Sequence, residues 1–211
     1  MTISALLEKI MRTFIFGFIF RAFVAAALFG LALEGVGAQT SAPPTIAREK
    51  TAGAPKAVHD FDFLVGHWRV HHRKLRVRLA NNQDWVEFEG TLDSRPLMDG
   101  YGNIDDDVFE VPGGTYRGIG LRSFDTQTLQ WSIWWLDGRT PLGPLDPPMR
   151  GGFKDGVGTF YGLDTLNGRQ VRARFIWSDI TPTSCHWEQA YSPDGGMTWE
   201  TNWVQEIRKA P

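Results

Sequence analysis

The amino-acid sequence predicts an all-β fold, a single antiparallel up-and-down β-barrel of about eight to ten strands. From residue 66 onward, short runs alternate apolar with polar residues, as in VRARFIW (171–177), so each run has one apolar face. Turn-forming segments separate these runs, and no amphipathic helix longer than a turn or two follows residue 66. Because an open sheet would expose two edges, consecutive strands with tight connections favour closure into a barrel.

Nine strands are expected along the chain. Their ranges are 66–79, 84–92, 103–111, 115–124, 129–137, 150–163, 168–178, 184–192 and 198–208. Turn signals between them are NNQD (81–84), DTQT (125–128), Asn167-Gly168 and SPDGG (192–196). The Pro-rich connection 137–152 is too long for a plain hairpin, and such loops often form lids or entrances. Before the first strand, HDFDFLVG (59–66) is expected to form a short helical lid.

The N-terminal residues 1–38 predict a secretory signal peptide. Arg12 and Arg21 precede the apolar run AFVAAALFGLAL, and the small residues VGA then offer a site for signal peptidase. We therefore expect cleavage after Ala38 and a periplasmic or secreted mature protein, with no stable membrane insertion once the leader is removed. An uncleaved anchor is the alternative, because the apolar stretch is nearly long enough to span a bilayer.

Residues 39–58 are predicted to be a flexible linker, and residues 59–208 the barrel domain. The linker is rich in Ala, Pro, Thr and Ser without a hydrophobic period, whereas all nine tryptophans lie after residue 67. A net charge of −2 and the lack of a Lys/Arg stripe exclude nucleic acid as an expected partner. The single cysteine, Cys185, excludes an intramolecular disulfide and is expected to be a buried structural thiol.

The first predicted strand is introduced by FDFLVGHW (61–68), which contains the triplet Gly66-His67-Trp68. Together with the ending WEQAYSPDGGMTWETNWVQEIR (187–208), this motif resembles an uncharacterised bacterial family of lipocalin-like (calycin-like) barrels, the domain of unknown function 1579 type. The resemblance covers about residues 59–208. It implies the barrel fold, with Trp68 packed across one end of the barrel, and it implies no established reaction.

The segment SPDGGMTW (192–199) matches the Asp-box pattern Ser-x-Asp-x-Gly-x-Thr-Trp. Asp194 can accept backbone N–H bonds across the turn, and the two glycines that follow permit positive φ. Sialidase propellers contain several such repeats, whereas this chain contains one. The motif therefore predicts a hairpin and does not imply sugar cleavage.

Three of the five histidines lie in the motif GHWRVHH. Along a strand His67 and His71 share one face, whereas His72 shares the other with Trp68, so the three do not converge on one metal ion. We expect no metal, and we expect His67 and His71 on the solvated outer face. No cofactor is expected, although haem bound through His72 or His186 stays open by analogy with other small barrels.

The acidic residues give no firm catalytic signature. The run Asp105-Asp106-Asp107 lacks the ligand pattern of an EF-hand and is expected to be a solvated turn before Val108. Glu188 and Glu200 could face one another on neighbouring strands, but their parity is opposite to that of the adjacent tryptophans, so exposure is favoured.

The expected function depends on what the many aromatic side chains of the barrel domain do. Aromatic side chains either fill the core or line a cavity for a flat or greasy molecule, and we expect the partner to be a small hydrophobic or aromatic ligand in the barrel interior. The candidate ligand-binding residues are Trp68, His72, Trp135, Tyr161, Trp177 and Gln189. One alternative is an enzyme, a lyase, isomerase or hydrolase, that uses His72 or a buried carboxylate as general base. Another is a structural envelope domain, and the oligomeric state stays open.

Overall fold

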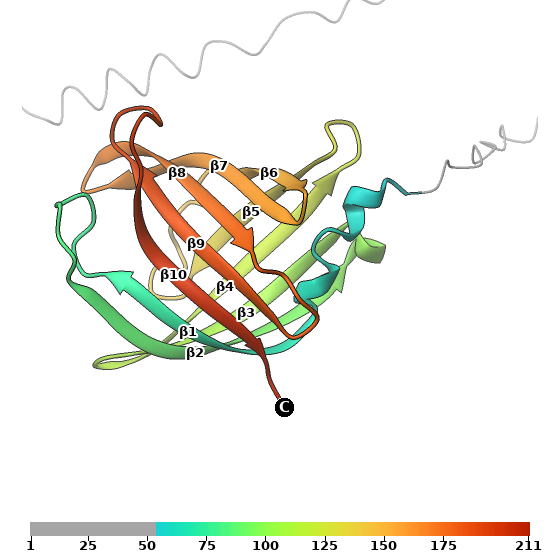
Figure 1. Cartoon of the computed structure of the whole chain (residues 1–211), viewed down its shortest axis with the longest axis horizontal. Helices are drawn as coiled ribbons and strands as arrows, with labels where there is room; N and C mark the ends of the chain where they lie inside the picture. Colours follow the sequence, from blue (N-terminus) through green and yellow to red (C-terminus); the bar gives the residue numbers. More distant parts are fainter. Residues whose placement is uncertain (1–53) are drawn as a thin grey trace, which may run out of the picture. The chain divides into compact units, whose positions relative to one another are not determined.

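The computed structural model describes residues 54–211. The predicted signal peptide (1–38) and residues 39–53 of the predicted linker lie outside the described residues. Residues 54–211 form a closed antiparallel barrel of ten strands in up-and-down order, which confirms the predicted all-β barrel (Figure 1). Strands hold 62% of these residues and helices 6%. No helix among them is long and apolar enough to cross a membrane.

The strands follow one another around the barrel in chain order. They are β1 Gly66–Leu75, β2 Trp85–Leu97, β3 Gly102–Val111, β4 Gly114–Asp125, β5 Gln130–Asp137, β6 Met149–Lys154, β7 Val157–Leu166, β8 Arg169–Ser178, β9 Ser184–Ser192 and β10 Glu200–Lys209. Three short 3₁₀-helices accompany them, η1 Lys56–His59, η2 Asp62–Leu64 and η3 Met98–Gly100. Strand β1 pairs with β10 as well as with β2, and this pairing closes the sheet.

The tenth strand comes from a turn that the sequence interpretation missed. The predicted strand 150–163 is two strands, β6 and β7, joined by Asp155 and Gly156. Both residues have positive φ, 51° and 80°, which is the backbone of a two-residue type I′ hairpin. The turn predicted at Asn167-Gly168, from a signal of the same kind, is confirmed between β7 and β8. Because of this turn, the residues of β7 that face inward are those expected to face outward, and the reverse.

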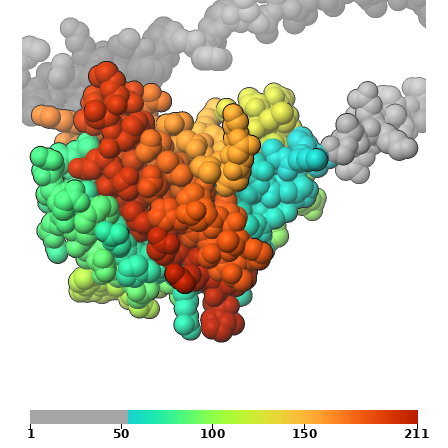
Figure 2. Space-filling view, viewed as in Figure 1, coloured from blue at the N-terminus to red at the C-terminus, as the bar shows by residue number. Residues whose placement is uncertain are grey.

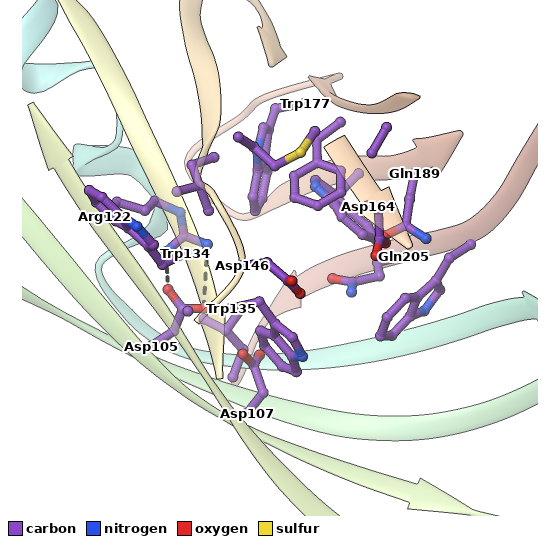
Figure 3. Close-up of a pocket in the computed structure, with 18 of the residues that line it drawn as sticks. Asp105, Asp107, Arg122, Trp134, Trp135, Asp146, Asp164, Trp177, Gln189 and Gln205 are labelled. Carbon is purple, nitrogen blue, oxygen red and sulfur yellow. Dashed lines mark hydrogen bonds and ion pairs between the residues drawn. The ribbon is translucent and has the colours of Figure 1, made fainter. Parts of the chain in front are cut away.

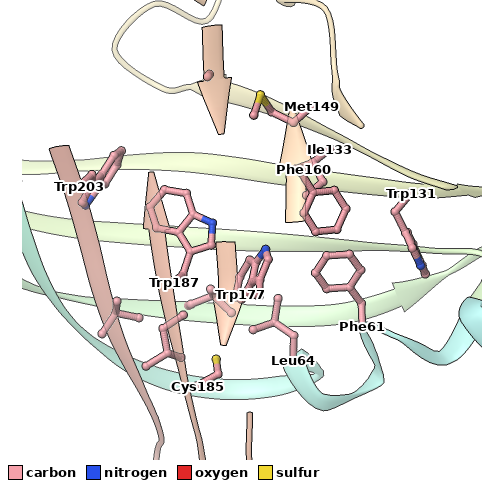
Figure 4. Close-up of a cluster of buried hydrophobic side chains, with 14 of the residues drawn as sticks. Phe61, Leu64, Trp131, Ile133, Met149, Phe160, Trp177, Cys185, Trp187 and Trp203 are labelled. Carbon is pink, nitrogen blue, oxygen red and sulfur yellow. The ribbon is translucent and has the colours of Figure 1, made fainter. Parts of the chain in front are cut away.

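One end of the barrel is closed by the segment that precedes β1. We call it the closed end. The predicted helical lid (59–66) contains η2, and η1 begins before it, within the predicted linker. This segment buries Val58, Phe61 and Leu64 in the core, and Figure 4 shows Phe61 and Leu64 among the core side chains. The ring of Phe61 meets that of Trp131 edge to face, with 5.1 Å between centroids. These aromatic contacts close the barrel interior at this end.

Two indole N–H groups of the strands form hydrogen bonds with the segment that closes this end. Trp68 Nε1 donates to the carbonyl oxygen of Leu64 at 2.7 Å, and Trp131 Nε1 donates to that of Ala57 at 2.9 Å. Trp68 therefore packs across the closed end, as the resemblance to lipocalin-like barrels implied. Because Ala57 takes part in this bonding, the folded body includes residues of η1.

The opposite end carries the longer connections, and we call it the open end. Its connections are residues 76–84, 112–113, 138–148, 167–168 and 193–199. The hairpin 193–199 projects from the barrel body (Figures 1 and 2). It has the predicted Asp-box turn, since Asp194 accepts hydrogen bonds from the backbone N–H groups of Met197 and Thr198 at 3.0 and 2.9 Å. The hydrogen bond from the Thr198 hydroxyl, with those from the Thr198 backbone N–H, the Ser192 hydroxyl and the Met197 backbone N–H, holds the pKa of Asp194 below its usual range.

Candidate ligand-binding cavity

A cavity of about 150 Å³ lies inside the barrel between the closed-end core and the open end (Figure 3). Five tryptophans line it, Trp134, Trp135, Trp177, Trp187 and Trp203. Its polar lining consists of Asp105, Asp107, Arg122, Asp146, Asp164, Gln189 and Gln205. The exposed residues Asp146 and Pro147 come from the long β5–β6 connection, and they place this loop at the mouth as expected for an entrance.

The aromatic part of the wall is a chain of rings in mutual contact. Trp187 lies edge to face with Trp203 at 5.7 Å and with Phe175 at 5.0 Å, and its ring centroid is 6.3 Å from that of Trp177 (Figure 4). Strand alternation puts Trp203 on the same inner surface, since it shares a face of β10 with Gln205 and Ile207. Contacts of this kind fix the rings in place, so the wall is a preformed apolar surface.

A buried ion pair forms the polar part of the wall. Arg122 on β4 donates to Asp105 on β3, and the same guanidinium donates to Asn103 Oδ1 at 3.0 Å. Gly120 makes room for this pair, because a Cβ atom there would lie 2.3 Å from Asp105 Oδ2. The expectation of a solvated turn at 105–107 is therefore wrong. These residues lie inside β3, where alternation turns Asp105 and Asp107 inward.

Asp107 is a second buried carboxyl group beside Asp105. Burial, reinforced by the negative charge of Asp105 and by a hydrogen bond with it, raises the pKa of Asp107 well above 3.8. The charge of Arg122 opposes this shift and does not cancel it. Asp107 therefore stays protonated to a higher pH than a solvated aspartate does. When protonated, the carboxyl group can donate as well as accept a hydrogen bond.

Two buried donors of the cavity lining have no hydrogen-bond partner among the described residues. They are Arg122 Nε and Trp177 Nε1. The guanidinium carbon of Arg122 lies 5.4 Å from the ring centroid of Trp177, so the two side chains are neighbours. By contrast, Gln189 Nε2 is satisfied by Asn202 Oδ1 at 2.8 Å. Because an unpaired buried donor is costly, a ligand acceptor atom placed near these two would be favoured.

Three of the six predicted ligand-binding residues line the cavity. They are Trp135, Trp177 and Gln189, which the barrel brings together from β5, β8 and β9. Trp68 is inside the barrel but belongs to the closed end, where its indole is bonded to Leu64. Contact with a ligand stays a prediction for all of them.

Tyr161 lies on the outer face, and its predicted inward orientation is wrong. Its neighbour Phe160 is fully buried, so alternation turns Tyr161 outward, where it is 43% exposed and packs on Trp199 with centroids 5.9 Å apart. The error follows from the missed turn between β6 and β7, because the strand parity was carried across it.

His72 points inward, as predicted, but does not line the cavity. Its ring stacks on Phe88 with centroids 4.6 Å apart, and its Nδ1 accepts a hydrogen bond from Trp203 Nε1 at 3.3 Å. Burial, with the nearby charge of Lys74, lowers the pKa of His72 to about 3. The ring is therefore neutral at physiological pH, and it positions the cavity tryptophan Trp203.

Three other histidines and Glu188 lie on the outer surface. His67 and His71 face outward and bond Asp93 and Glu89, which confirms the predicted solvated face. His186 Nδ1 lies 2.8 Å from Glu206 on the outer face, so neither haem candidate lines the cavity. Glu188 is also outside, partly exposed and 3.8 Å from Arg174.

Among residues 54–211, no cluster of three or more His, Cys, Asp or Glu side chains is arranged to hold a metal ion. No protein-family model matches the chain, and the search of curated proteins finds no match. The resemblance to lipocalin-like barrels therefore stays a prediction, and the cavity has to be interpreted from its own chemistry.

Proposed function

We propose that this protein binds a small, mostly apolar ligand with an aromatic ring and a hydrogen-bond acceptor in the barrel cavity. The observation that carries the proposal is the combination in one cavity of a tryptophan wall with two buried donors, Arg122 Nε and Trp177 Nε1, that have no partner within residues 54–211. Small-molecule sites are generally apolar pockets with a few convergent polar groups that orient the ligand.

The size of the cavity limits the ligand. Its volume is about 150 Å³, and an engineered protein cavity of about 150 Å³ accommodates benzene. A single substituted ring therefore fits, whereas a ligand with several fused rings would have to extend past Asp146 at the mouth. The polar wall favours a ring with an oxygen substituent, because the guanidinium of Arg122 donates, and the Asp107 carboxyl, whose pKa is raised, can also donate when it is protonated.

The test is a binding series with the purified protein, using toluene, phenol, benzoate and benzylamine as probes. We expect phenol or benzoate to quench tryptophan fluorescence and to bind at least about tenfold more tightly than toluene, since one satisfied buried donor contributes about 1.4 kcal/mol or more. Trp135→Ala should weaken phenol binding, and the matched control Trp85→Ala, on the outer parity of β2, should leave it unchanged. Equal binding of all four probes, or of none, would contradict the proposal.

A barrel-interior enzyme is the second candidate, and Asp107 favours it. A buried carboxyl with a raised pKa beside an ion pair is a common form of general acid. Native mass spectrometry of the protein as isolated, followed by incubation of the ligand that it releases, separates the two functions. Recovery of the ligand unchanged supports binding. Conversion that is lost in Asp107→Asn while the ligand still binds would establish the enzyme.

We also propose that the barrel acts outside the cytoplasm, after removal of residues 1–38. The support is the leader pattern, with its arginines, apolar run and small residues before Gln39. Intact-mass measurement on protein recovered from the envelope fraction tests it. A mass that begins at Gln39 supports export with cleavage, and a mass that retains the leader would mean an anchored protein.

A further inference from the structure

A second hollow lies at the open end, apart from the aromatic cavity. Its volume is about 290 Å³, and its lining combines apolar side chains with cations and one phenol: Leu75, Val86, Phe88 and Val111, then Lys74, Arg76, Arg78 and Arg139, and Tyr116. No carboxylate is among these lining residues. The hollow therefore offers an apolar floor with positively charged groups above it.

Lys74 is an inward-facing lysine in this hollow. Strand alternation places it on the same face of β1 as Trp68 and His72, so its side chain enters the barrel. Its Nζ lies 3.4 Å from the ring centroid of Trp203, and it forms no ion pair or hydrogen bond with any other residue of 54–211. A partly buried ammonium without a counter-ion is unusual, because charged groups are normally paired when they leave water.

The charged groups around Lys74 do not neutralise it. Arg78 and Arg139 face it from the β1–β2 and β5–β6 connections and repel its positive charge. Of the two carboxylates within electrostatic reach, Asp137 is held by Arg139 at 2.6 and 2.9 Å, and Asp164 accepts a hydrogen bond from the Tyr191 hydroxyl. Neutral His72 and the Tyr116 phenol, whose pKa is raised by burial, complete the titratable surroundings.

We propose that Lys74 is a nucleophilic amine that captures an apolar aldehyde in this hollow as a Schiff base. The neutral amine adds to the aldehyde carbon to form a carbinolamine, which then loses water and leaves an imine between Lys74 Nζ and the former carbonyl carbon. The reaction releases one water molecule and involves no change of oxidation state. The aldehyde's apolar body would rest on Phe88, Val86 and Val111.

The electrostatics of the site support this role. Burial, and next the charges of Arg78 and Arg139, lower the pKa of Lys74 to about 7, against 10.5 for a free lysine. About half of the amine is therefore neutral near pH 7, whereas a solvated lysine is almost entirely protonated. Desolvation and neighbouring cations are the means by which proteins make a lysine nucleophilic.

The experiment is reductive trapping of the full chain with benzaldehyde and sodium cyanoborohydride at pH 7, followed by peptide mapping. We expect benzylation of Lys74 at least about tenfold faster than that of Lys154, an exposed lysine on β6, because the neutral fraction of Lys74 is far larger. The rate at Lys74 should rise with pH and level off above about pH 7.

Two matched variants separate reactivity from folding. Lys74→Arg keeps the positive charge and should abolish the fast adduct, with circular dichroism reporting the retained barrel. Lys154→Arg should leave the fast adduct unchanged. Labelling of all lysines in proportion to their exposure, or slower labelling of Lys74 than of Lys154, would overturn the proposal. The readout does not depend on whether phenol or benzoate binds in the aromatic cavity.

Discussion

Tryptophan side chains have different roles in the closed-end core and in the wall of the cavity. At the closed end, the indole N–H groups of Trp68 and Trp131 are both bonded to main-chain carbonyls, and both rings are fully buried. In the cavity wall, which adjoins Phe61 of this core, Trp177 Nε1 and Arg122 Nε lack partners within the described residues, and a buried ion pair lies among the rings. The comparison indicates that the closed-end core contributes stability, whereas the cavity wall gives up stability for the capacity to bind.

The largest difference between the closed-end core and the cavity wall is expected when a tryptophan is truncated to alanine. Trp68→Ala should lower the free energy of unfolding by about 3–5 kcal/mol, because it empties a fully buried site and removes the bond to Leu64. Trp135→Ala, at a cavity residue that is 37% exposed, should cost no more than about 1.5 kcal/mol. Urea unfolding, with the slope checked for each variant, measures both. Equal losses of unfolding free energy in the two variants would remove the distinction between the closed-end core and the cavity wall.

The ion pair gives the next largest effect. Arg122→Met should cost about 3 kcal/mol, because it leaves the Asp105 carboxylate buried without its partner. Adding Asp105→Asn removes the stranded charge, so the double variant should recover more than half of the loss. The four stabilities of this double-mutant cycle are measured by urea unfolding. No recovery in the double variant would show that Arg122 acts through packing on Trp177 and not through its charge.

Acid should destabilise the barrel through His72. Its pKa is about 3 in the folded protein against 6.5 for a free histidine, so the unfolded chain binds the proton more readily. The stabilisation is complete above pH 6.5 and is lost as the pH falls from 6.5 toward 3, by about 1.4 kcal/mol per pH unit from this group. His72→Gln keeps an acceptor for Trp203 and removes the titration, so it should flatten the pH dependence measured by thermal unfolding. An unchanged slope would mean that other groups dominate.

The smallest effect is expected on the outer face. His67→Ala and His71→Ala should each change the free energy of unfolding by no more than about 0.5 kcal/mol at pH 7, because both rings are solvated and their ion pairs are exposed. Neither variant should alter phenol binding. A loss of binding in both, with His72→Gln unaffected, would contradict the orientation of β1.

The sequence was sufficient to predict the barrel because its strands alternate clearly and its turns contain recognisable residues. The prediction failed where a turn lay within an aromatic-rich run. Asp155-Gly156 is a type I′ signal, but its two flanking strands were read as one because apolar residues continue on both sides. The predicted orientation of Tyr161 is wrong for the same reason, because the alternation of inward and outward residues can be followed only within one strand.

The polar half of the site could not be predicted from residue types alone. Asp105 and Asp107 resembled a solvated turn because charged residues are normally exposed, and their partner Arg122 lies on the next strand. Pairing of β3 with β4 is needed to bring them together. Lys74 could have been found, because it shares the parity of Trp68 and His72, but its neighbours come from distant connections.

The buried thiol of Cys185 is a natural probe of how often the closed end opens. It is 2% exposed, and burial raises its pKa to about 12, so in the closed barrel a thiol reagent meets almost no thiolate. Cys185 lies on β9, which is paired on both sides, by β8 and by β10. Labelling therefore requires these strands to part, and because the chain has a single cysteine, the labelling rate reports the frequency of that opening without any engineered probe.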